Sequence, residues 1–319
     1  MNILFTNAGR RTYLIEDALA LGKIHDITPR VFVCDTTHLT ASMLVSPDVT
    51  SFVTPRVSDS PEHYVSVLKH ECKNREIDLI IPLMDFELAI LADHREHFNA
   101  MGTEVLVSSP EVIRSTLDKQ LCWYFCEQHG LDMPDTWFSG QSANRDKTPL
   151  ISKRTLGSGS EDLAILKCKE EIPDLVPEDF LFQEMVVGQE YGIDVLNGME
   201  GEFLHCCARR KISMRHGETD KAEVVYGELF DEIGRSISEI FRHIGNLDID
   251  FIIDSSGKVF FIDFNPRFGG GYPFTRAAGF DYLRAIIENL IGKSPELAGR
   301  GRNIIGAKGI RLFFQEEGR

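Results

Sequence analysis

The residues best suited to chemistry are acids that interrupt two apolar runs in the C-terminal third of the sequence. Residues 247–271 read LDIDFIIDSSGKVFFIDFNPRFGGG, in which two apolar runs flank a short stretch of Ser, Gly and Lys. Apolar runs separated by turn residues predict a β-hairpin. With a four-residue turn, Asp254 pairs with Val259, and Asp250 then falls opposite Asp263.

Asp250, Asp263 and Asn265 are predicted to converge on one spot of this hairpin. Asn265 lies two residues after Asp263, so both side chains share one face of the strand. Opposed side chains of an antiparallel pair have Cβ atoms about 4.5–5.5 Å apart, and Mg²⁺ prefers oxygen ligands. The pattern therefore predicts a magnesium site, with Mn²⁺ as a second metal. The alternative, that the acids face solvent, fits the hairpin alone equally well.

The composition excludes several classes of protein. The chain has 319 residues, enough for two or three domains, and its net charge of -15 argues against a nucleic-acid partner, because phosphate binding needs a basic surface. No apolar run approaches the ~18–20 residues of a membrane span, and the N-terminal residues show no secretory signal. The seven cysteines form no CxxC pair, so we expect free thiols in a reducing, cytoplasmic location.

The first 110 residues alternate apolar strands with helices, as in a Rossmann-like α/β domain. Strands are expected at 2–6, 31–35, 77–82 and 104–107. The turn after the first strand contains one glycine and lacks G-x-G-x-x-G, so dinucleotide binding is not expected. Asp85 and Glu87 follow the third strand and are predicted to begin a helix rather than to touch a substrate.

Two further segments place flexible or charged residues where a polyanion can bind. Residues 149–160 read as a strand ending in Lys153 and a glycine-rich loop, whose backbone can approach phosphates closely. The loop lacks the G-K-[ST] ending of a Walker A motif. Residues 203–225 concentrate five cations, and their spacing does not say which of them face inward: Arg209, Arg210, Lys211, Arg215 and Lys221. We also expect one helix running through 117–119 to about 130, and a last strand at 309–314.

In their order along the chain, these motifs resemble the ATP-grasp superfamily. The resemblance rests on Lys119 in a DK dipeptide, Lys153 with its glycine loop, the QE pair before Glu190, and acid-x-Asn-Pro-Arg in FIDFNPRFGGG. Asp263 stands where the family usually has Glu. Among the members, the sequence is most similar to stand-alone proteins related to the large subunit of carbamoyl-phosphate synthetase.

The resemblance implies a fold of the α/β and α+β classes. A Rossmann-like pre-ATP-grasp domain would span residues 1–110. A two-part ATP-grasp domain with mixed or antiparallel sheets would span residues 111–319. Within it, a lid subdomain with the glycine-rich loop would cover about 135–184, and a metal and catalytic subdomain about 185–319.

The resemblance also implies roles for individual residues. Nucleotide-binding residues would be Lys119, Lys153, Gly157, Ser158, Gly159, Ser160, Gln183, Glu184, Val186 and Glu190. The backbone of Glu184 and Val186 would bind adenine, and Glu190 would bind the ribose hydroxyls. Arg267 would stabilise oxyanion charge, with Lys211 and Arg215 as the other catalytic candidates. The metal ligands would be Asp250, Asp263 and Asn265.

The implied function is that of an ATP- and Mg²⁺-dependent, ADP-forming ligase. A substrate carboxylate would be activated as an acyl phosphate and attacked by an amine or another nucleophile. The partners would be small-molecule carboxylates and amines, and the assembly a homodimer. Three alternatives stay open: a kinase of the same superfamily that stops at phosphoryl transfer, a non-catalytic nucleotide-binding protein, and a Rossmann oxidoreductase.

Overall fold

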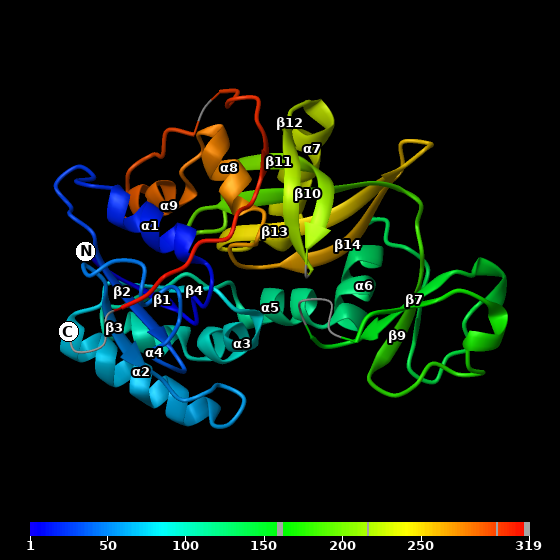
Figure 1. The fold of residues 1–319 in the computed structure, drawn as a ribbon, viewed down its shortest axis with the longest axis horizontal. Helices are drawn as coiled ribbons and strands as arrows, with labels where there is room; N and C mark the ends of the chain where they lie inside the picture. Colours follow the sequence, from blue (N-terminus) through cyan, green and yellow to red (C-terminus); the bar gives the residue numbers. More distant parts are fainter. Residues whose placement is uncertain (158–161, 216, 298, 316–319) are drawn as a thin grey trace.

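The computed structural model of the chain describes residues 1–157, 162–215, 217–297 and 299–315 (Figure 1). Three sheets follow one another along the long axis of the molecule: a parallel sheet with the N-terminus, a six-stranded sheet in the middle and a four-stranded sheet at the far end. This arrangement confirms the predicted fold class, an α/β domain followed by antiparallel sheets. The predicted boundary at residue 110 and the subdomain boundaries stay predictions.

The N-terminal sheet is parallel, with the strand order β3-β2-β1-β4-β5. Its strands are β1 (Asn2–Thr6), β2 (Arg30–Asp35), β3 (Thr50–Val53), β4 (Leu79–Pro82) and β5 (Glu104–Val105). Helix α1 (Thr12–Ala20) covers one face, and α2 (Pro61–Arg75), α3 (Asp85–Asp93) and α4 (Arg95–Asn99) cover the other. The strand order reverses between β1 and β4, which makes the carboxyl ends of these two strands the topological switch point.

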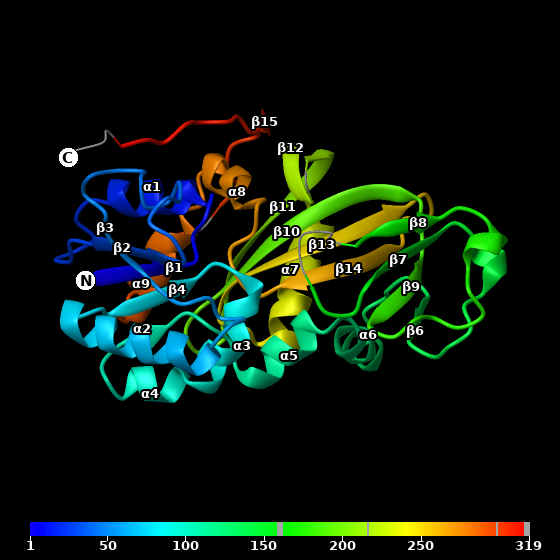
Figure 2. The same ribbon diagram turned by 60° about the horizontal axis from the view of Figure 1, so that its bottom comes forward.

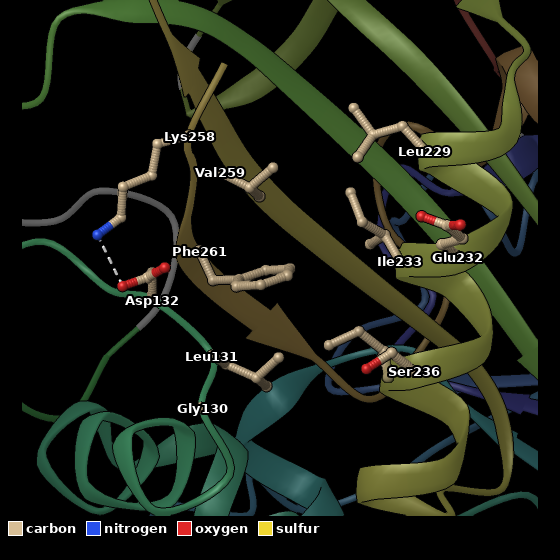
Figure 3. A pocket seen from close by; sticks show the side chains of 11 residues that line it. Gly130, Leu131, Asp132, Leu229, Glu232, Ile233, Ser236, Lys258, Val259 and Phe261 are labelled. Atoms are coloured by element: carbon tan, nitrogen blue, oxygen red, sulfur yellow. Dashed lines mark ion pairs between the residues drawn. The ribbon is translucent and has the colours of Figure 1, made fainter. Parts of the chain in front are cut away.

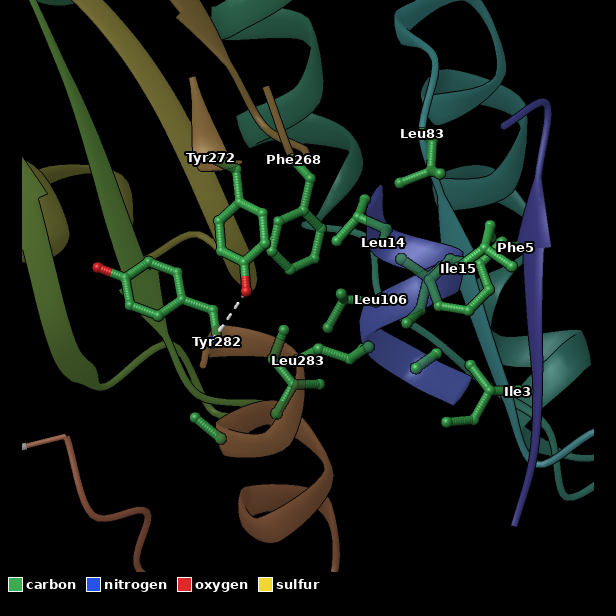
Figure 4. Close-up of a cluster of buried hydrophobic side chains, with 14 of the residues drawn as sticks. Ile3, Phe5, Leu14, Ile15, Leu83, Leu106, Phe268, Tyr272, Tyr282 and Leu283 are labelled. Atoms are coloured by element: carbon green, nitrogen blue, oxygen red, sulfur yellow. Dashed lines mark hydrogen bonds between the residues drawn. The ribbon is translucent and has the colours of Figure 1, made fainter. Parts of the chain in front are cut away.

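The largest buried cluster joins the C-terminal part of the chain to this sheet (Figure 4). Helix α9 (Tyr282–Leu290) contacts α1, and Leu283 lies in the same cluster as Ile3 and Leu14. Tyr272, the first residue of α8 (Tyr272–Ala278), belongs to this cluster as well. Because one continuous core spans both parts, loops from the two parts are held in fixed positions where they meet.

The six-stranded sheet has the order β14-β13-β10-β11-β12-β15 and is antiparallel throughout. Its strands are β10 (Gly188–Asn197), β11 (Phe203–Arg215), β12 (Glu218–Val225), β13 (Gly245–Asp254), β14 (Val259–Asn265) and β15 (Ile305–Ala307). Helix α7 (Glu228–Phe241) covers one face, where Ile237 packs with Phe251 and Phe261. On the other face, α8 contacts β11 and β12, so a site on that face lies beside this helix.

The four-stranded sheet has the order β6-β9-β7-β8 and lies at the end of the molecule opposite the N-terminus (Figure 2). Its strands are β6 (Thr136–Phe138), β7 (Leu150–Arg154), β8 (Ala164–Leu166) and β9 (Phe180–Glu184), with 3-10 turns at Arg145–Lys147 and Lys169–Glu171. Leu150 and Phe182 form a small core of its own with Ile172 and Val176. A separate core allows this sheet to move as a unit.

Two sequence-based predictions of elements are wrong. The helix expected to run through residues 117–119 is broken into α5 (Pro110–Leu117) and α6 (Lys119–Gln128). Asp118 between them has extended backbone and caps α6, since its side chain accepts hydrogen bonds from the amides of Gln120 and Leu121. The last strand is β15 rather than 309–314. Over the described ranges, no helix has the length and apolar character to span a membrane.

Candidate active site

A β-bulge in the β13–β14 hairpin sets the direction of the predicted metal ligands. At the turn, Ile253 pairs with Val259, so the predicted pairing of Asp254 with Val259 is wrong. The register then shifts by one residue along the strand, and Asp250 lies opposite Asp263 as predicted. A bulge sets two residues of one strand against one of its partner. It therefore offsets the one-residue error at the turn.

The same bulge separates an apolar face from a charged face. Phe251 pairs with Phe261 on the face that α7 covers, and both rings are buried. Asp250 and Asp263 pair on the opposite face. Without the register shift, a residue of β14 that now faces the site would face the apolar core, because a one-residue slip moves a strand's side chains to the other face.

Asn265 lies beside Asp263, as the sequence predicts. Its Nδ2 donates to Asp263 Oδ2 over 3.1 Å. Asp248 lies opposite Asn265 and adds a carboxylate that the sequence analysis did not include. The alternation of Asp248 and Asp250 in β13 places both on the charged face, so the pattern that revealed one acid contained the other.

Lys211 links the predicted ribose-binding acid to the predicted metal ligand. Its Nζ lies 2.8 Å from Glu190 Oε1 and 2.7 Å from Asp250 Oδ1. Burial raises the pKa of Asp250 to about 6 and the charges of Asp248 and Asp263 add to the shift, while Lys211 opposes it. The attraction of Asp250 and Glu190 raises the pKa of Lys211 against the effect of burial.

Arg209 is the second cation of the 203–225 segment that faces inward. It is fully buried, and its Nη1 donates to Asp194 Oδ2 over 2.7 Å while its Nη2 donates to Asp248. Although burial opposes ionisation, Arg209 is the main cation that lowers the pKa of Asp248. Two charges taken out of water need this close pairing, so Arg209 holds the charged face together.

The other cations of that segment point elsewhere. Arg210 pairs with Glu223 at 2.6 Å and is partly exposed. Arg215 and Lys221 are exposed on β11 and β12. The structure thus groups Lys211 with the predicted metal ligands and leaves Arg215 outside that group.

Arg267 contacts the N-terminal part of the chain. Its Nε and Nη2 donate to the two carboxylate oxygens of Asp85 at 2.9 and 3.1 Å, although the residues are 182 positions apart. Nη2 also donates to Asn265 Oδ1 over 3.0 Å. Asp85 begins α3, as predicted, but it also orients Arg267, which the sequence analysis missed. No spacing rule connects two residues so far apart.

The two predicted phosphate-binding lysines lie near the glycine-rich loop. Lys119 begins α6, and its Nζ donates to the carbonyl oxygen of Gly157 over 2.7 Å. Lys153 is half-buried on β7. Burial lowers the pKa of Lys153 to about 8, with Asp263 opposing and Lys119 adding to the shift. Lys153 is thus within electrostatic reach of Asp263 in the β13–β14 hairpin. Three predicted loop residues, Ser158, Gly159 and Ser160, lie outside the described residues.

The predicted adenine-binding segment connects β9 to β10. Gln183 is buried, and its Nε2 donates to Thr136 Oγ1 over 2.9 Å. Its side chain thus links β9 to β6 within the four-stranded sheet. Glu184 Oε2 accepts from Lys147 Nζ over 2.8 Å, a contact that the sequence did not predict. Within the described chain, the backbone of residues 185–187 makes no hydrogen bond. The amide and carbonyl of Val186 are thus free to bind a ligand.

The donor set of the hairpin fits a magnesium ion. No cluster of three or more His, Cys, Asp or Glu side chains arranged for a metal occurs among the described residues. Asp250, Asp263 and Asn265 instead offer two carboxylates and an amide. Mg²⁺ is commonly held by one or two carboxylates together with water and phosphate oxygens. Burial, and to a smaller extent the charges of Asp248 and Asp263, raises the pKa of Asp250, and a bound cation would favour the ionised form of this carboxylate.

A cavity of about 410 Å³ lies on the α7 side of the hairpin (Figure 3). Leu131, Ile233 and Val259 line it, and Asp132 pairs with Lys258 at its edge over 2.8 Å. None of the predicted site residues lines this cavity. The candidate site is therefore on the other face of the hairpin.

Comparison with known families agrees with this geometry. Residues 3–106 match the model of the PylC-like N-terminal domain, and residues 116–271 match the model of the ATP-grasp domain. This chain therefore carries an ATP-grasp domain. The matched range of the ATP-grasp domain includes the hairpin, the hinge at residues 184–186 and both lysines. The finer similarity to carbamoyl-phosphate synthetase stays a prediction. A comparison with curated proteins found no match.

Several solved structures share the fold over almost the whole chain. Biotin carboxylase from Campylobacter jejuni, solved as a β-γ-ATP complex, has a TM-score of 0.71 and 15% identity, over 92% of this chain and 71% of its own. N5-carboxyaminoimidazole ribonucleotide synthetase from Thermotoga maritima has a TM-score of 0.65 and 16% identity, over 92% and 76%. L-amino acid ligase from Bacillus licheniformis has a TM-score of 0.69 and 15% identity, over 90% and 73%.

Proposed function

We propose that this ATP-grasp protein is an ATP- and Mg²⁺-dependent ligase that joins a small carboxylate to an amine and releases ADP and phosphate. One observation carries the proposal: Lys211 contacts both Glu190 and Asp250, and Asp250 faces Asp263 on the same side of the sheet. The acid predicted to bind ribose, a cation and the two predicted metal ligands thus lie in one row. The named structural relatives are a carboxylase, a synthetase and a ligase.

In the proposed reaction, a carboxylate oxygen of the substrate attacks the γ-phosphorus of ATP. The bond between this phosphorus and the β–γ bridging oxygen breaks, and ADP leaves. The amine nitrogen then attacks the acyl carbon, the carbon–oxygen bond to the phosphate breaks, phosphate leaves, and the nitrogen loses a proton. Phosphoryl transfer depends mainly on positioning and charge neutralisation, with little covalent chemistry for the protein. The site supplies cations and oxygen ligands of that kind.

Each group of residues has a part in this proposal. The backbone at residues 184–186 would bind adenine, and Glu190 the ribose. Lys119 and Lys153 would bind phosphate oxygens, together with the glycine-rich loop. Lys211 keeps Asp250 ionised near neutral pH by its charge, and Arg267 would stabilise negative charge on the acyl group. Mg²⁺ held by Asp250, Asp263 and Asn265 would supply positive charge beside the phosphates.

Replacing Asp263 by Ala tests the proposal. Wild-type protein is incubated with ATP, Mg²⁺, a panel of carboxylates and hydroxylamine, which converts an acyl phosphate to a hydroxamate. We expect ADP and hydroxamate with at least one carboxylate, and a loss of about 10²–10³-fold or more in Asp263→Ala. Asp93→Ala, at an exposed position whose side chain makes no hydrogen bond or ion pair among the described residues, is the matched control.

Three results would argue against the ligase. Wild-type rates in Asp263→Ala would remove the metal pair from the reaction. ADP without hydroxamate, together with a stable phosphorylated product, would identify a kinase. Binding of ATP without ADP release across the panel would indicate a non-catalytic nucleotide-binding protein.

A further inference from the structure

The cations of the charged face are already paired with acids of the protein. Lys211 pairs with Asp250, Arg209 with Asp194, and Arg267 with Asp85. Arg267 and Asp85 have side chains only 9% and 13% exposed. An acidic partner offsets part of the charge of each of these cations. A further cation without an acidic partner would therefore favour binding of an anionic substrate at this interface.

Arg11 is a cation at the interface without an acidic partner. No acid of the described residues lies within 4.0 Å of its guanidinium, although the chain contains 49 Asp and Glu in total. Its Nε is buried and has no hydrogen-bond partner, and its Nη1 meets only the sulfur of Met84. A thioether sulfur is a weak acceptor. A partly buried cation without a counter-charge is costly, which favours an anionic ligand.

Arg11 also lies where an open α/β sheet binds ligands. It ends the loop that follows β1, and Met84 lies in the loop that follows β4. These two strands flank the topological switch point of the N-terminal sheet. The contact between Arg11 and Met84 therefore joins the two loops at the carboxyl ends of these strands.

Hydrogen bonds to neighbouring residues hold both loops in place. Asn7 donates from its backbone to Cys34 O over 2.9 Å, and the Gly9 amide donates to Asp35 Oδ2 over 3.0 Å. On the other side, the buried Glu87 accepts from the amides of Leu83 and Met84 at 3.1 and 3.2 Å. These hydrogen bonds thus fix the positions of the two loops around Arg11, as a binding residue requires.

A hydrogen bond of Tyr13 connects the segment after β1 to the candidate active site. Its hydroxyl donates to the carbonyl of Gly269, two residues after Arg267, over 2.9 Å. Burial raises the pKa of Tyr13, and Arg11, Arg267 and Asp248 all act on the same hydroxyl. The segment that carries Arg11 and Tyr13 therefore lies beside the segment that carries the catalytic candidate Arg267.

We infer that Arg11 binds the carboxylate of the acyl-donor substrate at the junction of the two domains. The inference rests on the proposed function for the reaction, but it makes a separate statement about binding. It assigns the substrate to the small organic acids, and it places their anionic group between the N-terminal loops and the hairpin.

The test compares Arg11→Met with Arg10→Met. Arg10 is the neighbouring residue, it is exposed, and no side-chain contact involves it among the described residues. Thermal unfolding is recorded with mono- and dicarboxylates of two to six carbons, without nucleotide. We expect at least one acid to stabilise wild type and Arg10→Met, and its affinity to fall about 10- to 100-fold in Arg11→Met. Arg11→Lys should retain part of the binding.

The outcomes separate the two proposals. If no carboxylate stabilises wild type, or if Arg11→Met binds the acids as well as Arg10→Met does, the inference about Arg11 is wrong, whatever the ADP assay shows. If carboxylates bind through Arg11 but wild type releases no ADP, the ligase proposal fails and the binding site stands. Should Arg11→Met unfold at room temperature, Arg11→Lys supplies the comparison, and unchanged affinity and selectivity in that variant would overturn the inference.

Discussion

Asp250 and Asp263 face each other across the bulged β13–β14 hairpin, on the side of the sheet away from α7. Burial, with the charges of Asp248 and Asp263, raises the pKa of Asp250 from 3.8 to about 6. The unfolded chain therefore releases this proton at lower pH than the folded protein does. The contribution of Asp250 to stability is highest below about pH 4, falls as the pH rises toward 6, and stays low above it.

A bound cation should offset the loss of stability that accompanies the ionisation of Asp250. We expect Mg²⁺ to raise the midpoint of thermal unfolding at pH 7.5, where Asp250 is ionised, and to have little effect at pH 5, where a proton occupies the carboxylate. The measurement is a thermal scan with MgCl₂ against NaCl of equal ionic strength. Asp263→Ala is the variant that should lose the shift at pH 7.5. Equal Mg²⁺ shifts at both pH values would contradict the assignment of Asp250 as a ligand.

Lys153 gives a second pH-dependent prediction. Burial lowers its pKa from 10.5 to about 8, so in the absence of nucleotide the side chain is charged below pH 8 and neutral above it. ATP affinity should thus weaken above pH 8, by up to about tenfold per pH unit, because binding must then be accompanied by protonation of the amine.

The Lys153→Arg variant separates this effect from other titrations. Arginine keeps its charge across the whole range, so its ATP affinity should vary little between pH 7 and pH 9.5. Isothermal titration of ATP with Mg²⁺ at four pH values compares it with wild type. Parallel pH profiles for the two proteins would exclude Lys153 as the group responsible.

The β13–β14 hairpin shows how much of the structure local sequence patterns can predict. Alternation and turn chemistry predicted that Asp250 faces Asp263, which is confirmed. The predicted turn was one residue out of register, and the bulge compensated for it. Turn length and bulges depend on the twist of the sheet and the packing of side chains beneath it. Phe261, which must stay in the apolar core beside Phe251, is such a constraint, and a single sequence does not reveal it.

Contacts between distant parts of the chain could not be predicted. Arg209 was one of five cations in its segment, and only the pairing of β11 with β10 places it against Asp194. The pair of Arg267 with Asp85 joins two domains. Periodicity reports which face of an element a residue occupies, whereas the docking of one domain on another follows from the shared core of α1 and α9.

The Asp85–Arg267 pair leads to a prediction about catalysis. Asp85→Asn keeps the size of the side chain but removes the charge that orients the guanidinium. We expect kcat to fall about 10- to 100-fold with the KM for ATP within twofold of wild type, because Arg267 lies away from the hinge. The free energy of unfolding should fall by about 1.5–3 kcal/mol. Asp93→Asn on the same helix is the control, and an Asp85→Asn variant indistinguishable from it would refute the positioning role.

Gly271 is predicted to be irreplaceable for steric reasons. A Cβ on this residue would lie 1.9 Å from the guanidinium of Arg209, which is fully buried and held between Asp194 and Asp248. The arginine cannot retreat without losing a partner, so Gly271→Ala should cost about 1–3 kcal/mol or more in urea unfolding. Gly309→Ala, with open space around the added methyl group, should change stability by less than about 1 kcal/mol. Equal unfolding midpoints for the two variants would show that the Arg209 pairings can rearrange.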